Sequence, residues 1–159
     1  MHTTTKHVYD YPIKTVYALL TDAEFLKSLF DDADTISHEV QVVGSRTSAT
    51  AVLSTPQQMR RFTGSTISAT LLIDWGELHS DGSYHGVISS DLKGLPAQLS
   101  GTASLHPTAS GTTVVYDTDF VISVPFVGRK LETAAAPYVM QIIDAQQPLG
   151  KAWLATHNL

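Results

Sequence analysis

Three stretches of the chain alternate apolar and polar residues with period two, and a short turn signal interrupts each of them. The first signal is Gly44 with Ser45. Folding the chain there gives four pairs on a mostly apolar face: Ile36 with Leu53, His38 with Ala51, Val40 with Ala49, and Val42 with Thr47. The other face of this hairpin is mostly polar, as expected of a sheet that is buried on one side only.

The second signal, Asp81 with Gly82, suits a two-residue hairpin turn, because both central positions need a positive φ. Its register gives three pairs: Trp75 with Ile88, Ile73 with Ser90, and Leu71 with Leu92. The third signal, Ser110 with Gly111, gives four: Leu105 with Tyr116, Ala103 with Thr118, Gly101 with Phe120, and Leu99 with Ile122. The three hairpins together predict one shared, concave apolar face.

Helical patterns flank these strands. After a first strand over residues 5–11, Pro12 suits the first position of a short helix and Asp22 suits the N-cap of a second. A stripe at period 3.6 predicts a long helix over residues 126–153 that packs on the sheet. Its members are Val127, Leu131, Ala134, Tyr138, Ile142, Ala145, Leu149 and Trp153. Because Pro137 and Pro148 each remove a backbone donor, we expect kinks in this helix, or a break near Ala136.

The order of these elements is strand, two helices, six strands and helix. It predicts an α+β fold in which a seven-stranded curved antiparallel sheet wraps around a long C-terminal helix. No internal repeat, low-complexity tract or linker divides the chain. We therefore expect one domain over residues 1–159.

Composition and charge narrow the function classes. Hydrophobic residues make up 43% and charged residues 16% of the 159, which is typical of a chain that folds by itself. A net charge of −5, with no basic cluster larger than two residues, argues against nucleic acid as a partner. Residues 1–6 lack an export-signal pattern, and no stretch approaches the ~18 apolar residues of a membrane span. The expectation is a cytoplasmic protein, and its oligomeric state cannot be predicted.

Several short segments, taken in order, resemble a known family. They are Tyr11-Pro12, Arg61-Phe62-Thr63-Gly64, Asp74-Trp75, residues 124–132 and Trp153-Leu154. On these segments the whole chain resembles an uncharacterised actinobacterial family, the domain of unknown function 2505, of the START and polyketide-cyclase superfamily. The resemblance implies a START-like helix-grip fold with a cavity. Members of that superfamily bind lipids, sterols or polyketides, and a minority catalyse cyclisation, dehydration or ring hydroxylation. No catalytic residue is implied for this chain.

Small residues on the predicted inner face favour a pocket between the sheet and the C-terminal helix. Alanine and glycine leave volume there, although neighbouring large rings could fill it. We expect ten residues to contact a ligand: His38, Ala51, Trp75, Tyr84, Ile88, Gly101, Tyr116, Phe120, Tyr138 and Ile142.

His38 is the one ionisable residue that the first hairpin places on the concave face. An imidazole there could orient a ligand carbonyl or act as an acid or base near neutral pH. Alternatively, His38 is a core histidine whose nitrogens bond to a backbone carbonyl or a tyrosine hydroxyl.

The sequence gives little support for a metal site, a catalytic nucleophile or a phosphate-binding loop. His79 and His85 flank the second turn, but the predicted register sends their rings to opposite faces, so they should not bind a metal together. The chain has no cysteine, and we find no His-Glu-x-x-His motif, no Gly-x-Ser-x-Gly elbow and no phosphate-binding loop. We therefore assign no catalytic residue, no metal and no cofactor.

Three functions stay open. The leading hypothesis is the binding or carriage of a small hydrophobic molecule. The first alternative is an enzyme of the polyketide cyclase or dehydratase type with His38 as acid or base. The second is a protein-interaction module that uses the outer sheet face around Val115 and Val121.

Overall fold

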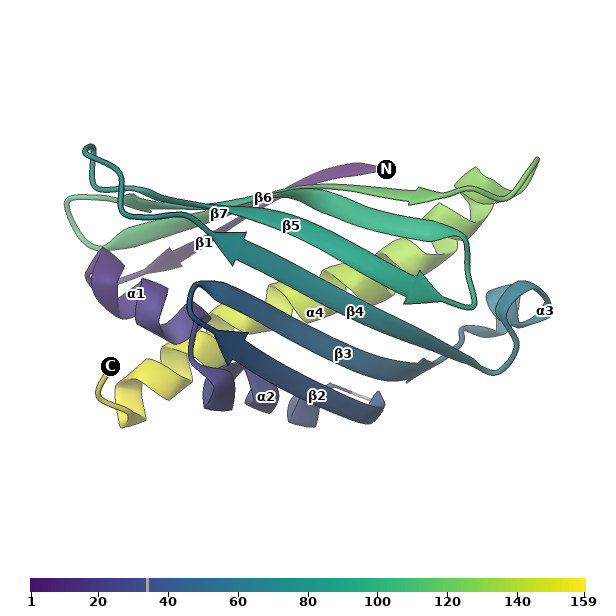
Figure 1. Ribbon diagram of the computed structural model, residues 1–159, viewed down its shortest axis with the longest axis horizontal. Coiled ribbons are helices and arrows are strands. Elements are labelled where there is room, and N and C mark those ends of the chain that lie inside the picture. Colours follow the sequence, from purple (N-terminus) through teal and green to yellow (C-terminus); the bar gives the residue numbers. More distant parts are fainter. Residues whose placement is uncertain (34) are drawn as a thin grey trace.

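The computed structural model describes residues 1–33 and 35–159, and its strands form one antiparallel sheet over a long helix (Figure 1). The strands are β1 (His2–Tyr9), β2 (Thr35–Val43), β3 (Arg46–Ser54), β4 (Thr66–Trp75), β5 (Tyr84–Lys93), β6 (Ala97–Pro107) and β7 (Thr112–Ile122). The helices are α1 (Ile13–Leu20), α2 (Ala23–Asp32), α3 (Arg60–Thr63) and α4 (Gly128–Thr156), with a 3₁₀ turn η1 (Gln57–Met59). The predicted α+β fold is confirmed. The structure adds η1 and α3 between β3 and β4.

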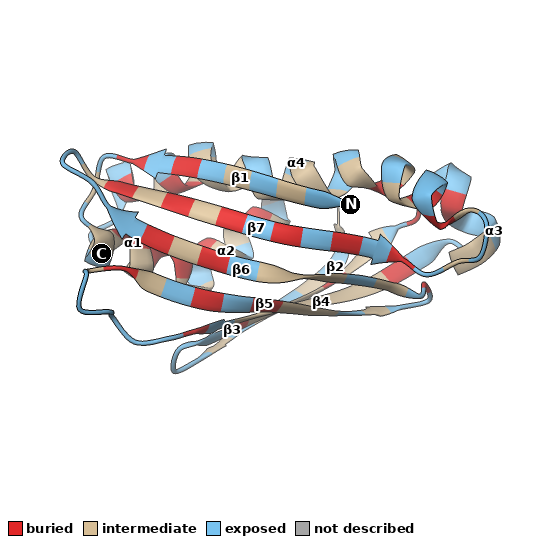
Figure 2. Cartoon of the chain, turned by 90° about the horizontal axis from the view of Figure 1, so that it is seen from above, coloured by how far each residue is buried: buried red, intermediate tan, exposed pale blue. Residues whose placement is uncertain are grey.

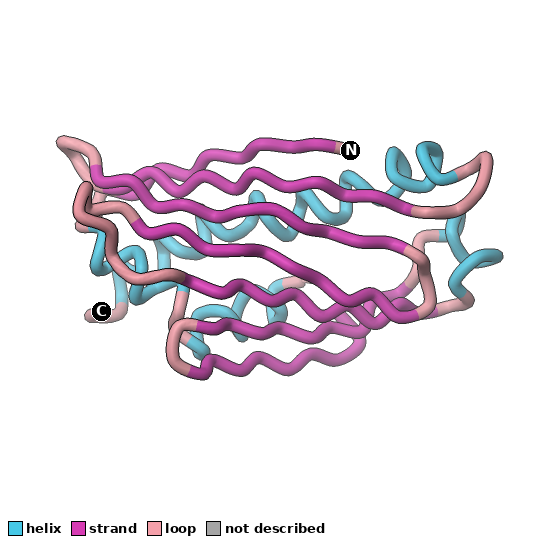
Figure 3. The backbone as a smooth tube through the Cα atoms, turned by 45° about the horizontal axis from the view of Figure 1, so that its top comes forward, coloured by secondary structure: helices cyan, strands magenta, loops and turns pink. Residues whose placement is uncertain are grey.

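The strands follow one another across the sheet in the order β1-β7-β6-β5-β4-β3-β2, and every neighbouring pair is antiparallel. The sheet is curved, and α4 runs along its concave side (Figure 3). α4 packs most closely on β7, β1 and α2, while α2 also lies against β2. No helix in the described ranges combines the length and hydropathy that a bilayer crossing requires.

The predicted inner face is confirmed for every strand except at Ile36 of β2. On β7, alternate residues are buried while Asp117 and Asp119 are exposed, a pattern visible in Figure 2. Successive pairings show that His38, Trp75 and Phe120 share this inner face. Because neighbouring side chains on a strand point to opposite faces, the alternation determines the face of each strand.

The register of the first hairpin is as predicted from His38 to Thr47. The pairing of Ile36 with Leu53 is wrong, because a bulge between Thr35 and Ser37 sets Leu53 opposite Thr35. Ile36 is therefore the extra residue of a β-bulge, and it is 59% exposed.

The other two registers differ from the prediction by two residues. Trp75 pairs with Gly86 instead of Ile88, and Tyr116 pairs with Ala103 instead of Leu105. Both loops are longer than two residues. The Asp81 carboxylate accepts hydrogen bonds from the backbone and hydroxyl of Ser83 in one, and the backbone N–H of Thr108 donates to the Gly111 carbonyl in the other. A shift of two residues keeps every side chain on its predicted face.

The shift changes which ring meets a missing side chain. Gly101, predicted to lie opposite Phe120, pairs with Thr118. The ring of Trp75 packs instead over Gly86, where an added Cβ would lie 2.9 Å from Trp75 Cε3. A glycine is therefore required beneath the indole at this position.

The second short helix begins as predicted, and the first begins one residue later than predicted, with Pro12 as its N-cap instead of its first residue. β1 ends at Tyr9, two residues earlier than expected, and Pro12 directly precedes α1. Asp22 caps α2, since its carboxylate accepts a hydrogen bond from the backbone N–H of Phe25 at 3.0 Å.

The predicted break in the C-terminal helix is wrong, because α4 is continuous from Gly128 to Thr156. Pro137 and Pro148 lie on its more exposed side. Each leaves a carbonyl four residues earlier without its usual partner, and the exposed positions of Thr133 and Asp144 let water bond to those carbonyls.

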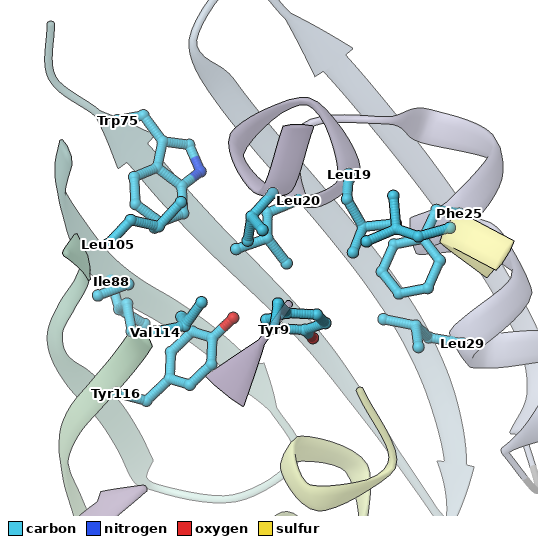
Figure 4. Close-up of a cluster of buried hydrophobic side chains, with 13 residues drawn as sticks. Tyr9, Leu19, Leu20, Phe25, Leu29, Trp75, Ile88, Leu105, Val114 and Tyr116 are labelled. Carbon is cyan, nitrogen blue, oxygen red and sulfur yellow. The ribbon is translucent and has the colours of Figure 1, made fainter. Parts of the chain in front are cut away.

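The buried apolar residues divide into two clusters. The first core cluster contains Tyr9, Val16, Leu19, Leu20, Phe25, Leu29, Trp75, Ile88, Ala103, Leu105, Val114, Tyr116 and Leu154 (Figure 4). The second core cluster contains Met59, Ile67, Leu95, Phe120, Ile122, Leu131 and Ala135. The two lie toward opposite ends of the strands, which leaves a region of the inner face between them.

Candidate ligand-binding site

The inner face carries small residues between the two core clusters. Each of the four strands β4 to β7 has one such residue between a member or neighbour of the first cluster and one of the second. They are Ala69, Ser90, Gly101 and Thr118, and Ala51 on β3 pairs directly with Ala69. We call these five residues the central zone.

On α4, Ile142 belongs to neither cluster and lies between Val139, which packs on the second cluster, and Ile143, which packs on the first. Ala69, Ser90, Gly101 and Ile142 are only half-buried although they face the interior. Larger side chains at these positions would be expected to bury them fully, because protein interiors are normally packed to crystal-like density. Three predicted ligand contacts, Ala51, Gly101 and Ile142, lie in or over this zone.

Four more of the predicted residues gather at one end of it. Trp75, Ile88 and Tyr116 belong to the first core cluster (Figure 4), and Tyr84 packs against that cluster. Tyr84 also stacks on Tyr17 of α1, with ring centres 4.1 Å apart. These side chains form a packed wall at this end of the interior, and α1 covers it.

Phe120 lies at the other end, in the second core cluster. Tyr138 does not lie in the interior at all. Its side chain is 55% exposed, because the buried side of α4 passes through Ala135 instead of Ala134, which turns Tyr138 toward solvent. The predicted contact from Tyr138 is therefore wrong for an enclosed ligand.

His38 points toward α2. Its Nε2 lies 3.0 Å from an oxygen of Asp31, and its Nδ1 lies 3.2 Å from the hydroxyl of Thr35. The ring also stacks on Phe30. Both nitrogens thus have partners, although these are a carboxylate and a threonine hydroxyl instead of the predicted backbone carbonyl or tyrosine hydroxyl.

The sequence reasoning missed His7, a buried histidine on β1. Only 3% of its surface is exposed, and neither ring nitrogen has a hydrogen-bond partner in the described residues. The ring meets the edge of Tyr116, with centres 5.6 Å apart. The signal that could have found His7 is its alternation with Tyr9, which places both side chains on the inner face.

His7 belongs to a small polar group at the edge of the central zone. The hydroxyl of Tyr116 donates a hydrogen bond to Oε1 of Gln146, and the hydroxyl of Tyr9 donates to the backbone carbonyl of Gln146 at 3.3 Å. Gln146 is four residues from Ile142, so it lies on the same side of α4. We call His7, Tyr116 and Gln146 the polar corner.

Burial dominates the electrostatics of the polar corner. It lowers the pKa of His7, against the smaller opposing effects of the Asp144 carboxylate and of the nearby Gln146 side chain, whose contact with the ring falls outside the geometry of a hydrogen bond. It raises the pKa of Tyr116 and of Tyr9. All three groups are consequently uncharged at neutral pH, and the imidazole of His7 presents one N–H donor and one bare acceptor nitrogen.

A second group of histidines lies on the outer surface. The prediction that His79 and His85 point to opposite faces is wrong, because their ring centres are 4.6 Å apart. The wider loop folds His79 back beside His85, and His106 lies 5.7 Å from His85 on the other side. In residues 1–33 and 35–159, no three His, Asp or Glu side chains are placed to hold a metal ion.

Similarity to known proteins extends along nearly the whole chain. The family model described as "Protein of unknown function (DUF2505)" matches residues 4–154. No protein with a curated description matches the chain.

Solved structures share the fold across a similar span. The Zhui aromatase/cyclase from Streptomyces sp. R1128 is 13% identical with a TM-score of 0.62, over 97% of this chain and 94% of that one. A STAR-related lipid transfer protein from Xanthomonas axonopodis is 16% identical with a TM-score of 0.60, over 94% and 84%. A protein from Thermus thermophilus is 18% identical with a TM-score of 0.61, over 99% and 100%. These likenesses show a START-like helix-grip fold.

Proposed function

The chain belongs to the DUF2505 family, whose function is unknown, and we propose that it binds a small, largely apolar molecule between the sheet and α4. The central zone carries this proposal. Small residues line the inner face there, between the two core clusters, and Ala69, Ser90 and Gly101 among them are only half-buried. An apolar molecule that covered them would gain roughly 25 cal/mol for each Å² of apolar surface removed from water.

The polar corner supports a ligand with one uncharged polar group. A buried imidazole without a partner costs about 1–3 kcal/mol, which a hydrogen bond from the ligand would recover. The neutral His7 ring can donate to a carbonyl oxygen or exchange two hydrogen bonds with a hydroxyl. A carboxylate fits less well, because Asp144 places a negative charge near the ring.

The names of two similar structures agree with this class of ligand. One is called a lipid transfer protein and the other an aromatase/cyclase. At identities of 16% and 13%, they support an apolar ligand only as the general use of this fold.

Filling the central zone tests the proposal. Ala69→Phe places a ring in the proposed ligand space, whereas Ser68→Phe adds the same ring to the outer face of the same strand. We expect wild type and Ser68→Phe to bind Nile red, an uncharged apolar dye with a carbonyl group, and Ala69→Phe to lose that binding while staying folded. Native mass spectrometry after gentle purification would look for a copurified ligand.

The opposite result would count against a binding site. If the interior is already full, Ala69→Phe overpacks it and destabilises the fold by about 1–3 kcal/mol. A destabilised Ala69→Phe variant, together with a wild type that neither binds the dye nor gains thermal stability with apolar compounds, would overturn the proposal.

A further inference from the structure

The sheet is split between β5 and β6. These strands pair from Tyr84–Leu105 to Ile88–Gly101 and no further, although both continue for several residues beyond that point. On their other sides both stay paired, β5 with β4 to Lys93 and β6 with β7 to Ala97. The two halves of the sheet therefore separate at this end while each remains intact.

The pairing between β5 and β6 ends at Gly101, and this residue has an unusual backbone conformation. Its φ is +154°, and a Cβ at this position would overlap the carbonyl oxygen of Asp117 on β7. Only glycine fits this backbone conformation beside β7, and beyond this residue β6 pairs with β7 but no longer with β5. In that stretch, the backbone N–H of Leu99 donates to the hydroxyl of Ser90 at 2.8 Å in place of a ladder bond.

The split holds a cavity of about 370 Å³, which we call the β5–β6 slot. Its lining comes from both faces of the sheet. Ser90, Leu92 and Ala97 belong to the inner face, and Asp91, Gln98 and Val121 to the outer face. The slot is open to solvent and lies where β5 and β6 are no longer paired.

The slot leads to the proposed binding site. Ser90 lines the slot and is also part of the central zone, and the buried Leu95 on its wall belongs to the second core cluster. The other sides are more closed. α4 packs on β1 and β7, α2 packs on β2, and the hydroxyl of Tyr116 ties the middle of α4 to β7.

A second cavity, of about 540 Å³, lies between α2 and the end of α4 and is lined by residues of those helices only. Phe25 packs against Trp153 there, with ring centres 5.7 Å apart, and the first core cluster lies behind them. This cavity therefore has no comparable path to the central zone.

We propose that the β5–β6 slot is the passage through which the ligand enters and leaves the interior. The proposal rests on the proposed function. An apolar molecule crossing the sheet here meets Leu92, Ala97 and Val121, and it must break one hydrogen bond, from the backbone N–H of Leu99 to the hydroxyl of Ser90, instead of a series of ladder bonds. A narrow passage limits rates without changing the affinity of the bound state.

Closing the slot with a covalent bridge tests whether it is the passage. Because the chain has no cysteine of its own, introduced cysteines are the only thiols that can react. The pair Asp91→Cys with Gln98→Cys faces outward across the slot, so a disulfide or a short bismaleimide between them closes its outer mouth. The matched control is Thr50→Cys with Thr70→Cys, across the paired strands β3 and β4, where the native hydroxyls lie 2.9 Å apart. Stopped-flow fluorescence with Nile red measures association and dissociation before and after bridging.

We expect bridging of the slot to slow both rates by about tenfold or more at an unchanged Kd, and bridging of the control to change neither. Gln98→Trp, which needs no bridge, should slow both rates in the same way. Equal rates in the bridged and open slot variants would overturn the passage. If no variant, open or bridged, binds the dye, the proposed function fails instead.

Discussion

The hydroxyl of Tyr116 donates a hydrogen bond to the side-chain oxygen of Gln146, and so joins β7 to the middle of α4. Both groups lie beside the unpartnered ring of His7. This bond therefore fixes α4 at a set distance from the sheet, between the first core cluster and the central zone.

Removing that bond should weaken the fold. We expect Tyr116→Phe to lower the free energy of unfolding by about 1–2 kcal/mol, because the half-buried Gln146 side chain loses its hydrogen-bond donor. Tyr116→Phe combined with Gln146→Leu should lose less than the two single changes together, since both polar partners are then gone. Urea denaturation of the four proteins gives the coupling. Strictly additive losses would contradict a bond between these side chains.

His7 should make stability depend on pH in the acid range. Its pKa is lowered from 6.5 in the folded state, so the unfolded chain binds a proton that the folded chain refuses. The folded state therefore loses stability as the pH falls below about 6.5, and regains it as the pH rises. His7→Gln should flatten that part of the profile, as measured by urea denaturation at several pH values.

His2 offers a control for that profile. It is exposed, and its pKa is raised by a hydrogen bond to Asp119 and by the charge of Asp117. Its contribution has the opposite sign: it is present at low pH and is lost as the pH rises through the raised pKa. His2→Gln should therefore not remove the acid sensitivity. A profile unchanged by His7→Gln would show that other groups cause it.

The contact between Trp75 and Gly86 should be intolerant of any side chain. Gly86→Ala places a Cβ 2.9 Å from the indole, and we expect a loss of about 1–3 kcal/mol in unfolding free energy. Gly44→Ala is the comparison. Its Cβ would meet nothing within 4 Å, so only the positive φ of +60° opposes it and the loss should be about 1 kcal/mol. Equal losses would mean that the indole moves aside freely.

We expect the main role of His38 to be structural: it holds α2 against β2. His38→Gln removes the contacts with Asp31 and Phe30, so amide hydrogens of α2 should exchange faster while the affinity for Nile red is retained. The same variant tests the enzyme hypothesis. Loss of turnover of an identified substrate, without a change in its binding, would instead support His38 as an acid or base.

Alternation of side chains carried most of what the sequence could predict. It assigned His38, Trp75 and Phe120 to one face correctly, because that assignment survives any error of two residues in register. The conformations of the loops were harder to predict from the sequence. The bonds from Ser83 to the Asp81 carboxylate hold a wider turn than the dipeptide Asp81-Gly82 suggests, and such side-chain bonds compete with the standard hairpin turn.

The site was predicted only in part, for two physical reasons. The stripe on α4 was centred one residue too early, which placed Tyr138 inside and left Gln146 out. Histidine is polar, so the pattern of apolar residues gave no weight to His7 on β1, and its burial depends on pairing with β7 across more than a hundred residues. Long-range contacts of this kind are not visible in local periodicity.

The division of the apolar interior into two clusters has a consequence for motion. A fold with one continuous core tends to open all at once, whereas here the portion around Met59, Leu95 and Leu131 shares no buried member with the portion around Tyr9, Phe25 and Trp75. The end that holds α3 and the start of α4 can loosen while the opposite end stays closed. Strands β5 and β6 can therefore separate further beyond Gly101 without unfolding of the whole domain.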